Sequence, residues 1–214
     1  HERPAAPNST HIAADLKLDQ RLKGVMWYSL YDVDFNGAWT YEHESDESGE
    51  LVVGFQFPDQ NGLYDNFSFV VDGRDLAREL HPEGGRVQAT IPVEPGQKVT
   101  LGIGYGSRGM DNWEYRPTEG VSNLENFRVD LTTDFADIDF PAAGMSPSSR
   151  KAVGSGYALT WDFKQVVTGN SIGMVMPTRI QPGELASSMS LSAPVSLFFF
   201  FLVLFVFGTM RNID

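Results

Sequence analysis

One stretch near the end of the chain constrains the fold most, because residues 191–210 carry no charged side chain. The stretch reads LSAPVSLFFFFLVLFVFGTM, and about 20 apolar residues are what a helix needs to cross the hydrocarbon layer of a bilayer. A helix satisfies its own backbone hydrogen bonds, so such a run is stable in lipid. We expect Pro194 in its first turn and Ser190 or Ser192 as its N-cap. The sequence therefore predicts one transmembrane helix over residues 191–210.

The residues that flank this stretch indicate its orientation. Arg211 follows it directly, whereas residues 181–191 contain no Lys or Arg. Loops that carry Lys and Arg tend to stay on the cytoplasmic side of a membrane. The sequence thus predicts a cytoplasmic start at residues 211–214, and a juxtamembrane segment at residues 178–190 that leads to an extracytoplasmic N-terminal part. The alternative is a buried core helix or strand of a water-soluble protein.

The composition excludes several classes of function. The net charge of −12 argues against a nucleic-acid partner, because phosphate binding needs a basic surface. The absence of cysteine removes disulfides, zinc–thiolate sites and cysteine nucleophiles. There is no H-E-x-x-H motif and no phosphate-binding loop. We therefore expect no catalytic residues, no metal and no cofactor, and a protein that is not an enzyme.

Most of the remaining chain is typical of short strands separated by turns. The Asn36-Gly37 pair lies between two aromatic-rich segments and predicts a type I′ turn that closes a hairpin. Alternating or β-branched patterns predict further strands along the chain. The predicted strands cover residues 25–35, 38–43, 51–57, 67–71, 86–93, 98–105, 127–132, 157–163 and 171–176.

This series of closely spaced strands, without a long amphipathic helix between them, predicts an all-β fold of the sandwich or jelly-roll-like type. We assign the extracytoplasmic β-domain to residues 24–177. Residues 1–23 form an N-terminal segment that we expect to be partly disordered, with a short helix or strand at residues 13–22. We also expect the chain to be an internal part of a longer protein.

A possible cation site lies in the second predicted strand region. Asp32, Asp34, Asn36 and Gly37 follow the D-x-D-x-N-G pattern that opens a calcium loop. Such a loop closes with a bidentate Glu at position twelve, where this chain has His43. The flanking residues are also typical of strands, so a plain hairpin is the favoured interpretation, and whether the turn binds a cation stays open.

Aromatic side chains suggest a second kind of site. Trp113 and Tyr115, with Arg108 nearby, are the candidates for a ligand-binding surface, since exposed aromatic rings can stack on sugars. Together with paired acids such as Asp137 and Asp139, they support an alternative function in carbohydrate binding or processing. Buried, the same aromatic rings would simply fill the core of a β-sandwich.

Four stretches together carry a resemblance to a known family. They are residues 104–117 (GYGSRGMDNWEYRP), 131–147 (LTTDFADIDFPAAGMSP), 159–186 (LTWDFKQVVTGNSIGMVMPTRIQPGELA) and 192–205 (SAPVSLFFFFLVLF). Over roughly residues 102–214 the chain resembles bacterial inner-membrane proteins of the CreD family. The resemblance implies a large periplasmic domain, an additional membrane helix before it and several more after residues 191–210. It also implies a role in cell-envelope integrity, without established catalytic residues.

Overall fold

The computed structural model describes residues 5–117 and 120–211, and it divides into two compact units. The larger unit comprises the chain up to residue 20 together with residues 29–177. The smaller unit joins residues 21–28, at the tip of the first hairpin, to the chain from residue 178 onward.

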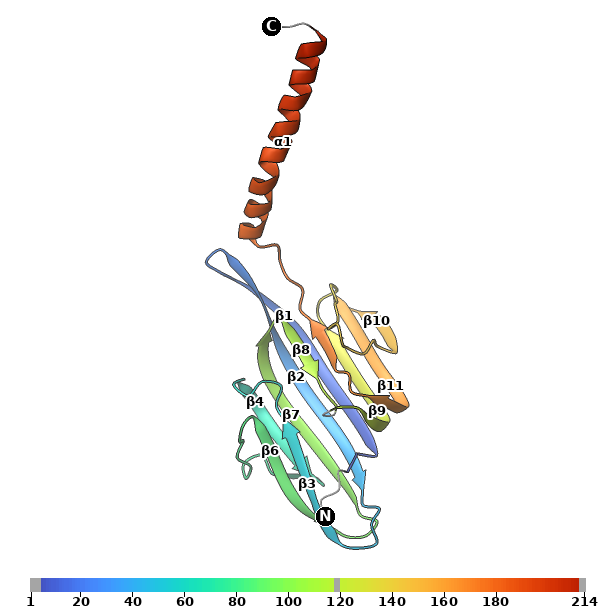
Figure 1. The fold of residues 1–214 in the computed structure, drawn as a ribbon. Coiled ribbons are helices and arrows are strands. Elements are labelled where there is room, and N and C mark those ends of the chain that lie inside the picture. Colours follow the sequence, from blue (N-terminus) through green and yellow to red (C-terminus); the bar gives the residue numbers. More distant parts are fainter. Residues whose placement is uncertain (1–4, 118–119, 212–214) are drawn as a thin grey trace. The chain divides into compact units, whose positions relative to one another are not determined.

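Strands make up nearly all of the regular structure of the larger unit, and one long helix, α1 (Pro182–Met210), belongs to the smaller unit (Figure 1). The strands in the described residues are β1 (Ser9–Lys23), β2 (Met26–Glu42), β3 (Gly49–Gln56), β4 (Tyr64–Val71), β5 (Arg74–Asp75), β6 (Arg86–Val93), β7 (Lys98–Met110), β8 (Asn112–Tyr115), β9 (Ser122–Thr133), β10 (Ser149–Val153), β11 (Gly156–Thr168) and β12 (Ile172–Val175). The predicted class, an all-β sandwich-like domain followed by an apolar helix, is therefore confirmed.

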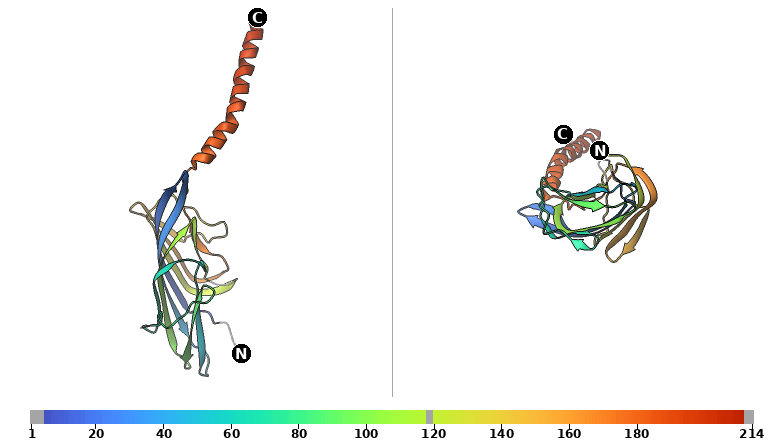
Figure 2. Two further views of the ribbon diagram at one scale, coloured as in Figure 1. Left: turned by 90° about the vertical axis from the view of Figure 1, so that its left-hand side faces the viewer. Right: turned by 90° about the horizontal axis from the view of Figure 1, so that it is seen from below.

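One large sheet organises the larger unit, and it is strongly curved (Figure 2). Its strand order is β10-β11-β9-β1-β2-β7-β4-β5. Most neighbours are antiparallel, but β1 and β9 pair in parallel, with Ile12 opposite Val129. Two short ribbons, β3 with β6 and β8 with β12, complete the sandwich.

The core lies between the large sheet and the two ribbons. Alternate residues of each strand point to the same face, so β1 contributes Ile12 and Leu16 to the core, and β9 contributes Phe127 and Leu131. The ribbons add further buried residues to the same cluster, including Phe55 of β3 and Val87, Trp113, Ile172 and Met174. Burial of this apolar surface against a curved sheet is what stabilises the domain.

The predicted turn at Asn36-Gly37 is wrong. β2 passes straight through both residues and stays paired with β7, with Asn36 opposite Gly104 and Gly37 opposite Ile103. Glycine at position 37 leaves room for the Trp39 side chain, because a Cβ there would lie 2.3 Å from the Trp39 ring. Long-range pairing of β2 with β7 from Leu30 to Glu42 thus overrides a local preference for a turn.

The N-terminal part also differs from the prediction. β1 begins at Ser9 and lies between β9 and β2, well inside the large sheet, so the β-structure starts before residue 24. The Asn8 N–H donates to the Thr40 carbonyl (2.8 Å), and Asn8 Oδ1 accepts from the Glu42 N–H (2.7 Å). These bonds hold the beginning of β1 against the end of β2, and residues 1–4 lie outside the described residues.

The helix begins earlier than predicted. α1 starts at Pro182, so Pro194 lies inside it and not in its first turn. Ser192 is also inside the helix, where its hydroxyl donates to the Met189 carbonyl (3.0 Å) and does not cap the helix. The N-cap is Gln181, with Pro182 in the position where a missing N–H costs nothing.

Candidate functional site

The predicted ligand-binding residues do not form an exposed surface. Trp113 of β8 is only 2% exposed, and Tyr115, two residues along the same strand, packs against the core. β8 pairs with β12, which puts Trp113 opposite Met174, itself fully buried. The expectation that these two aromatic residues are exposed is therefore wrong, because the β8–β12 ribbon turns them inward.

These aromatic residues belong to a cluster in the core. The Phe35 ring stacks on Tyr105 at 4.8 Å and lies 5.9 Å from Tyr115. The Trp113 Nε1–H has no hydrogen-bond partner of good geometry, and the Tyr105 hydroxyl is the polar group near it. Burial raises the pKa of Tyr105 far above its ordinary value, and the contact with Trp113 offsets this only in part. The cluster is uncharged and fills the sandwich.

Arg108 lies elsewhere, on the outer surface of the large sheet. Its guanidinium binds the Asp32 carboxylate of the neighbouring strand through two hydrogen bonds, Nε to Oδ1 at 2.7 Å and Nη2 to Oδ2 at 3.1 Å. Both side chains are about half exposed, so this pair fixes β2 against β7 at a modest gain in stability. The structure does not bring Arg108 together with Trp113 and Tyr115 in one site.

The D-x-D-x-N-G pattern is drawn out along a strand. Asp32, Asp34 and Asn36 alternate with the buried Val33 and Phe35, so they lie in a row on the outer face of β2. The Asn36 amide donates to Asp34 (3.1 Å), while Asp32 binds Arg108. Within the described residues no three His, Cys, Asp or Glu side chains are close enough to hold a metal ion. An extended strand cannot wrap oxygen ligands around a cation as a calcium loop does.

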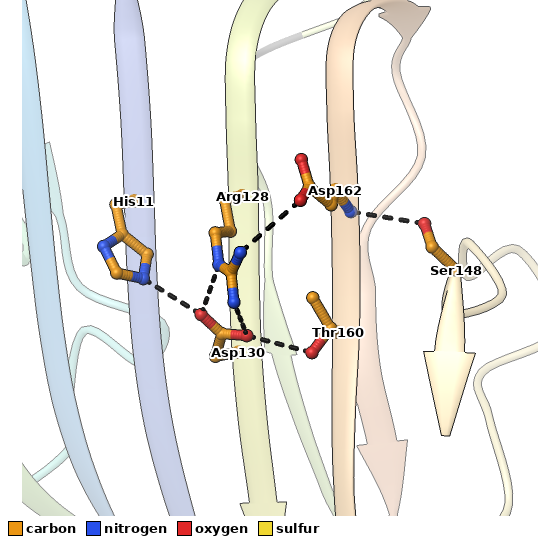
Figure 3. A network of polar contacts seen from close by, with 6 residues as sticks. All are labelled: His11, Arg128, Asp130, Ser148, Thr160 and Asp162. Atoms are coloured by element: carbon orange, nitrogen blue, oxygen red, sulfur yellow. Dashed lines mark hydrogen bonds and ion pairs between the residues drawn. The ribbon is translucent and has the colours of Figure 1, made fainter. Parts of the chain in front are cut away.

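A network of polar side chains crosses three strands of the large sheet (Figure 3). Asp130 of β9 is its centre and accepts hydrogen bonds from three side chains. The partners are His11 of β1 (3.0 Å), Arg128 (2.7 Å and 3.0 Å) and Thr160 of β11 (2.9 Å). Arg128 also reaches Asp162 of β11 at 3.4 Å. The network thus joins β1, β9 and β11 on one face.

Asp130 is held ionised by these neighbours. Partial burial opposes its charge, but the hydrogen bonds from Arg128, His11 and Thr160 together lower its pKa below the ordinary value. His11, Arg128 and Thr160 each alternate with buried residues on their own strands, so their side chains lie on the outer face of the sheet. This alternation is the part of the network that the sequence indicates. The parallel pairing of β1 with β9 joins residues more than a hundred positions apart, so sequence reasoning missed the network.

A shallow depression of about 180 Å³ lies further along the same strands. Asp15, Lys17, Asp34 and Asp134 are among the residues that line it. Asp15 accepts a hydrogen bond from Thr132, and Asp134 accepts one from the Leu18 N–H (2.9 Å). Pockets for small molecules usually have a volume of about 300–1,000 Å³, so this open depression is too small for such a ligand.

The smaller unit contains the second region with functional character. Within residues 185–210 of α1, an 18-residue window has a mean hydropathy of 2.4, and none of this window is buried. Close to the start of α1, Gln181 binds the backbone of Trp27, and the Arg179 guanidinium lies 4.3 Å from the centre of the Trp27 ring. The helix is long and apolar enough to cross a membrane, as the sequence predicted for residues 191–210.

Comparisons with known proteins do not identify the chain. No described family and no curated protein matches it. A Legionella pneumophila protein, named as a candidate nutrient binding protein, is 11% identical with a TM-score of 0.47, over 80% of this chain and 68% of that one. An M1 zinc metallopeptidase from Deinococcus radiodurans is 13% identical with a TM-score of 0.39, over 80% of this chain and 43% of that one. The chain thus spans less than half of the metallopeptidase, and likenesses this low carry no inference about activity.

Proposed function

We propose that this chain is part of a bacterial inner-membrane protein whose β-domain lies in the periplasm and which acts without catalysis in cell-envelope integrity or maintenance. The bilayer, through residues 191–210, is its first partner. The resemblance to the CreD family supports this role and adds further membrane helices of the same protein as partners.

The exposed apolar helix is the observation that carries the proposal. Twelve of the thirteen side chains from Val195 to Phe207 are Val, Leu or Phe, all in a helix without a buried face. At roughly −0.3 to −0.6 kcal/mol for each such residue, this part of the helix favours insertion by roughly 4–7 kcal/mol. In water the same side chains would expose a continuous apolar surface, which soluble proteins avoid.

The orientation rests on the end of the helix. Arg211 is the C-cap, and its N–H donates to the Phe207 carbonyl at 3.1 Å. Its side chain therefore follows the last apolar turn directly, where a guanidinium on the cytoplasmic side obeys the positive-inside rule. The acidic β-domain then lies on the periplasmic side.

Single cysteines test this topology, since the chain contains none of its own. Val121→Cys places a thiol at a residue that is 77% exposed in the β-domain, and Thr209→Cys places one in the last turn of α1. In intact bacterial spheroplasts, a membrane-impermeant maleimide should label Val121→Cys, and should label Thr209→Cys only after lysis. Labelling of Thr209→Cys before lysis, or recovery of the chain in the soluble cytoplasmic fraction, would contradict the proposal.

A further inference from the structure

The hairpin tip, defined here as residues 21–28, exposes apolar side chains that the rest of the sheet buries. It joins the end of β1 to the start of β2 through Gly24, whose φ of +64° suits the tight turn. Leu22 is 54% exposed, Val25 75% and Met26 50%. Lys23 stands among them. Three large apolar residues exposed within five positions are typical of a surface that contacts a protein or a membrane.

Gln181 ties this tip to the start of the helix. Its side-chain oxygen accepts from the Trp27 N–H (3.0 Å), and its amide nitrogen donates to the Trp27 carbonyl (2.8 Å). Gln181 is the N-cap of α1, yet its side chain makes no capping hydrogen bond. It forms hydrogen bonds with the Trp27 backbone instead. Arg179 adds a cation–π contact of 4.3 Å with the same Trp27. The tip and the start of α1 accordingly belong to one compact unit.

The length of α1 sets the level of the tip relative to a bilayer. The helix has 29 residues, which is about 44 Å at ~1.5 Å per residue. A bilayer is about 30 Å thick in its hydrocarbon core and about 40–45 Å with its headgroup layers. If the candidate span of residues 185–210 crosses the bilayer with a tilt, Pro182 lies three residues, about 5 Å, before the span and therefore in the headgroup layer. Trp27, bound to the residue just before Pro182, lies at the same level.

We propose that the hairpin tip is a membrane-surface element that lies in the phospholipid headgroup layer beside α1. Leu22, Val25 and Met26 contact the boundary of the acyl chains, and Lys23 extends its ammonium toward lipid phosphates, as long basic side chains do at interfaces. Trp27 lies among the headgroups, where tryptophan is enriched in membrane proteins. This inference rests on the proposed function, because it requires α1 to span the bilayer.

Depth-dependent fluorescence quenching tests the inference on the full chain. Val25→Cys, labelled with an environment-sensitive dye, is reconstituted in vesicles of phosphatidylcholine and phosphatidylglycerol with doxyl groups near the acyl-chain boundary. A side chain about 5–10 Å into the boundary should lose about half of its emission. Leu63→Cys is the matched control, because Leu63 is 78% exposed and lies in the larger unit, where its emission should stay unchanged. Leu202→Cys, near the middle of residues 191–210, reports separately whether the helix inserts, in a second set of vesicles with doxyl groups near the ends of the acyl chains.

The combined results separate the two proposals. Quenching of Leu202→Cys without quenching of Val25→Cys would overturn the role of the hairpin tip and leave the membrane helix intact. Absence of quenching at both positions would overturn the membrane helix and this inference with it. Equal quenching of Val25→Cys and Leu63→Cys would also contradict a specific role for the tip.

Removal of the tether provides a second test. Gln181→Ala, made in the labelled Val25→Cys chain, deletes both hydrogen bonds to Trp27 and should clearly reduce the quenching of Val25 while that of Leu202 stays. Gln88→Ala is the matched control, since Gln88 is exposed on β6 in the larger unit. Unchanged quenching in Gln181→Ala would show that Gln181 does not hold the tip at the membrane.

Discussion

Phenylalanine occupies opposite environments in the two units of this protein. Phe35, Phe69 and Phe127 of the large sheet are 0% exposed, whereas Phe198 and Phe200 of α1 are 63% and 59% exposed. The side chain is the same, so the arrangement along the chain makes the difference. In the sheet, apolar residues alternate with polar ones and gain their burial from other strands. In α1 they follow one another around the whole helix, and no other part of the described chain covers them.

The two units obtain their stability in different ways. The β-domain excludes water from its apolar residues by packing them against each other, so its stability depends on shape and on single side chains. The helix depends on an apolar solvent, so its placement depends on the sum of many residues and on the absence of charge.

Trp161→Ala should have the largest effect on the β-domain. Trp161 is fully buried, and its Nε1–H donates to the Met145 carbonyl at 2.9 Å. Removal of such a ring costs about 3–5 kcal/mol in free energy of unfolding. Chemical denaturation in detergent, followed by near-ultraviolet circular dichroism, measures this change. Phe200→Ala, in α1, should leave the free energy of unfolding of the β-domain unchanged. Equal losses of this free energy in the two variants would contradict the difference between the two units.

Phe200→Arg should weaken the membrane attachment without unfolding the β-domain. An arginine at the centre of a membrane helix costs about 2.5–3.5 kcal/mol, and the lost phenylalanine adds about 0.3–0.6 kcal/mol. A larger share of the chain should then be released from membranes by alkaline carbonate. Leu63→Arg, at an exposed loop residue of the larger unit, is the control and should stay in the membrane fraction. Equal release of both variants would contradict the account.

Glycine-to-alanine changes sharpen the contrast between close packing and solvation. A Cβ at Gly156, at the start of β11, would lie 1.9 Å from the Thr133 carbonyl oxygen. Since backbone atoms cannot move aside easily, Gly156→Ala should lower the free energy of unfolding by about 1–3 kcal/mol. Gly208→Ala in α1 meets nothing within 4 Å and should cost nothing. Thermal melts of the two variants measure this difference in stability. A Gly156→Ala variant as stable as the wild type would contradict the expected role of close packing.

Asp130→Asn should have the smallest effect, because its network lies at the surface. The ionised form is stabilised in the folded chain, so the pKa of Asp130 lies below its ordinary value of 3.8. This contribution is complete above pH 3.8 and is lost as the pH falls through the lower pKa of the folded state. With screening by solvent, it amounts to less than about 1 kcal/mol. Unfolding of the wild type and of Asp130→Asn, compared at pH 7 and pH 3, should differ more at pH 7.

Much of the β-structure can be predicted from sequence. Residues 86–93 were expected as a strand and form β6 with the same bounds, because RVQATIPV alternates clearly and ends before the Pro95-Gly96 turn. The predicted segment at residues 51–57 likewise corresponds to β3. Local alternation suffices where a strand is short and has one polar face.

The long strands and the position of the aromatic residues could not be predicted in this way. β2 extends through turn-like residues because β7 pairs with it from Leu30 to Glu42, and β1 lies between two neighbouring strands. Such pairing is a property of the whole sheet. Trp113 and Tyr115 resemble a loop in sequence, and only their pairing with β12 turns them inward. For the same reason the link between Trp27 and Gln181, 154 residues apart, left no local signal.

Amide hydrogen exchange of α1 measures whether this helix lies in lipid. In lipid nanodiscs, the amides from Val195 to Phe207 should exchange slowly, and the purified chain should aggregate once detergent and lipid are both removed. This follows because backbone groups inside a bilayer have no water to exchange with. A chain that stays monodisperse in detergent-free buffer, with these amides equally protected, would show that the helix packs inside a water-soluble particle and would contradict the account.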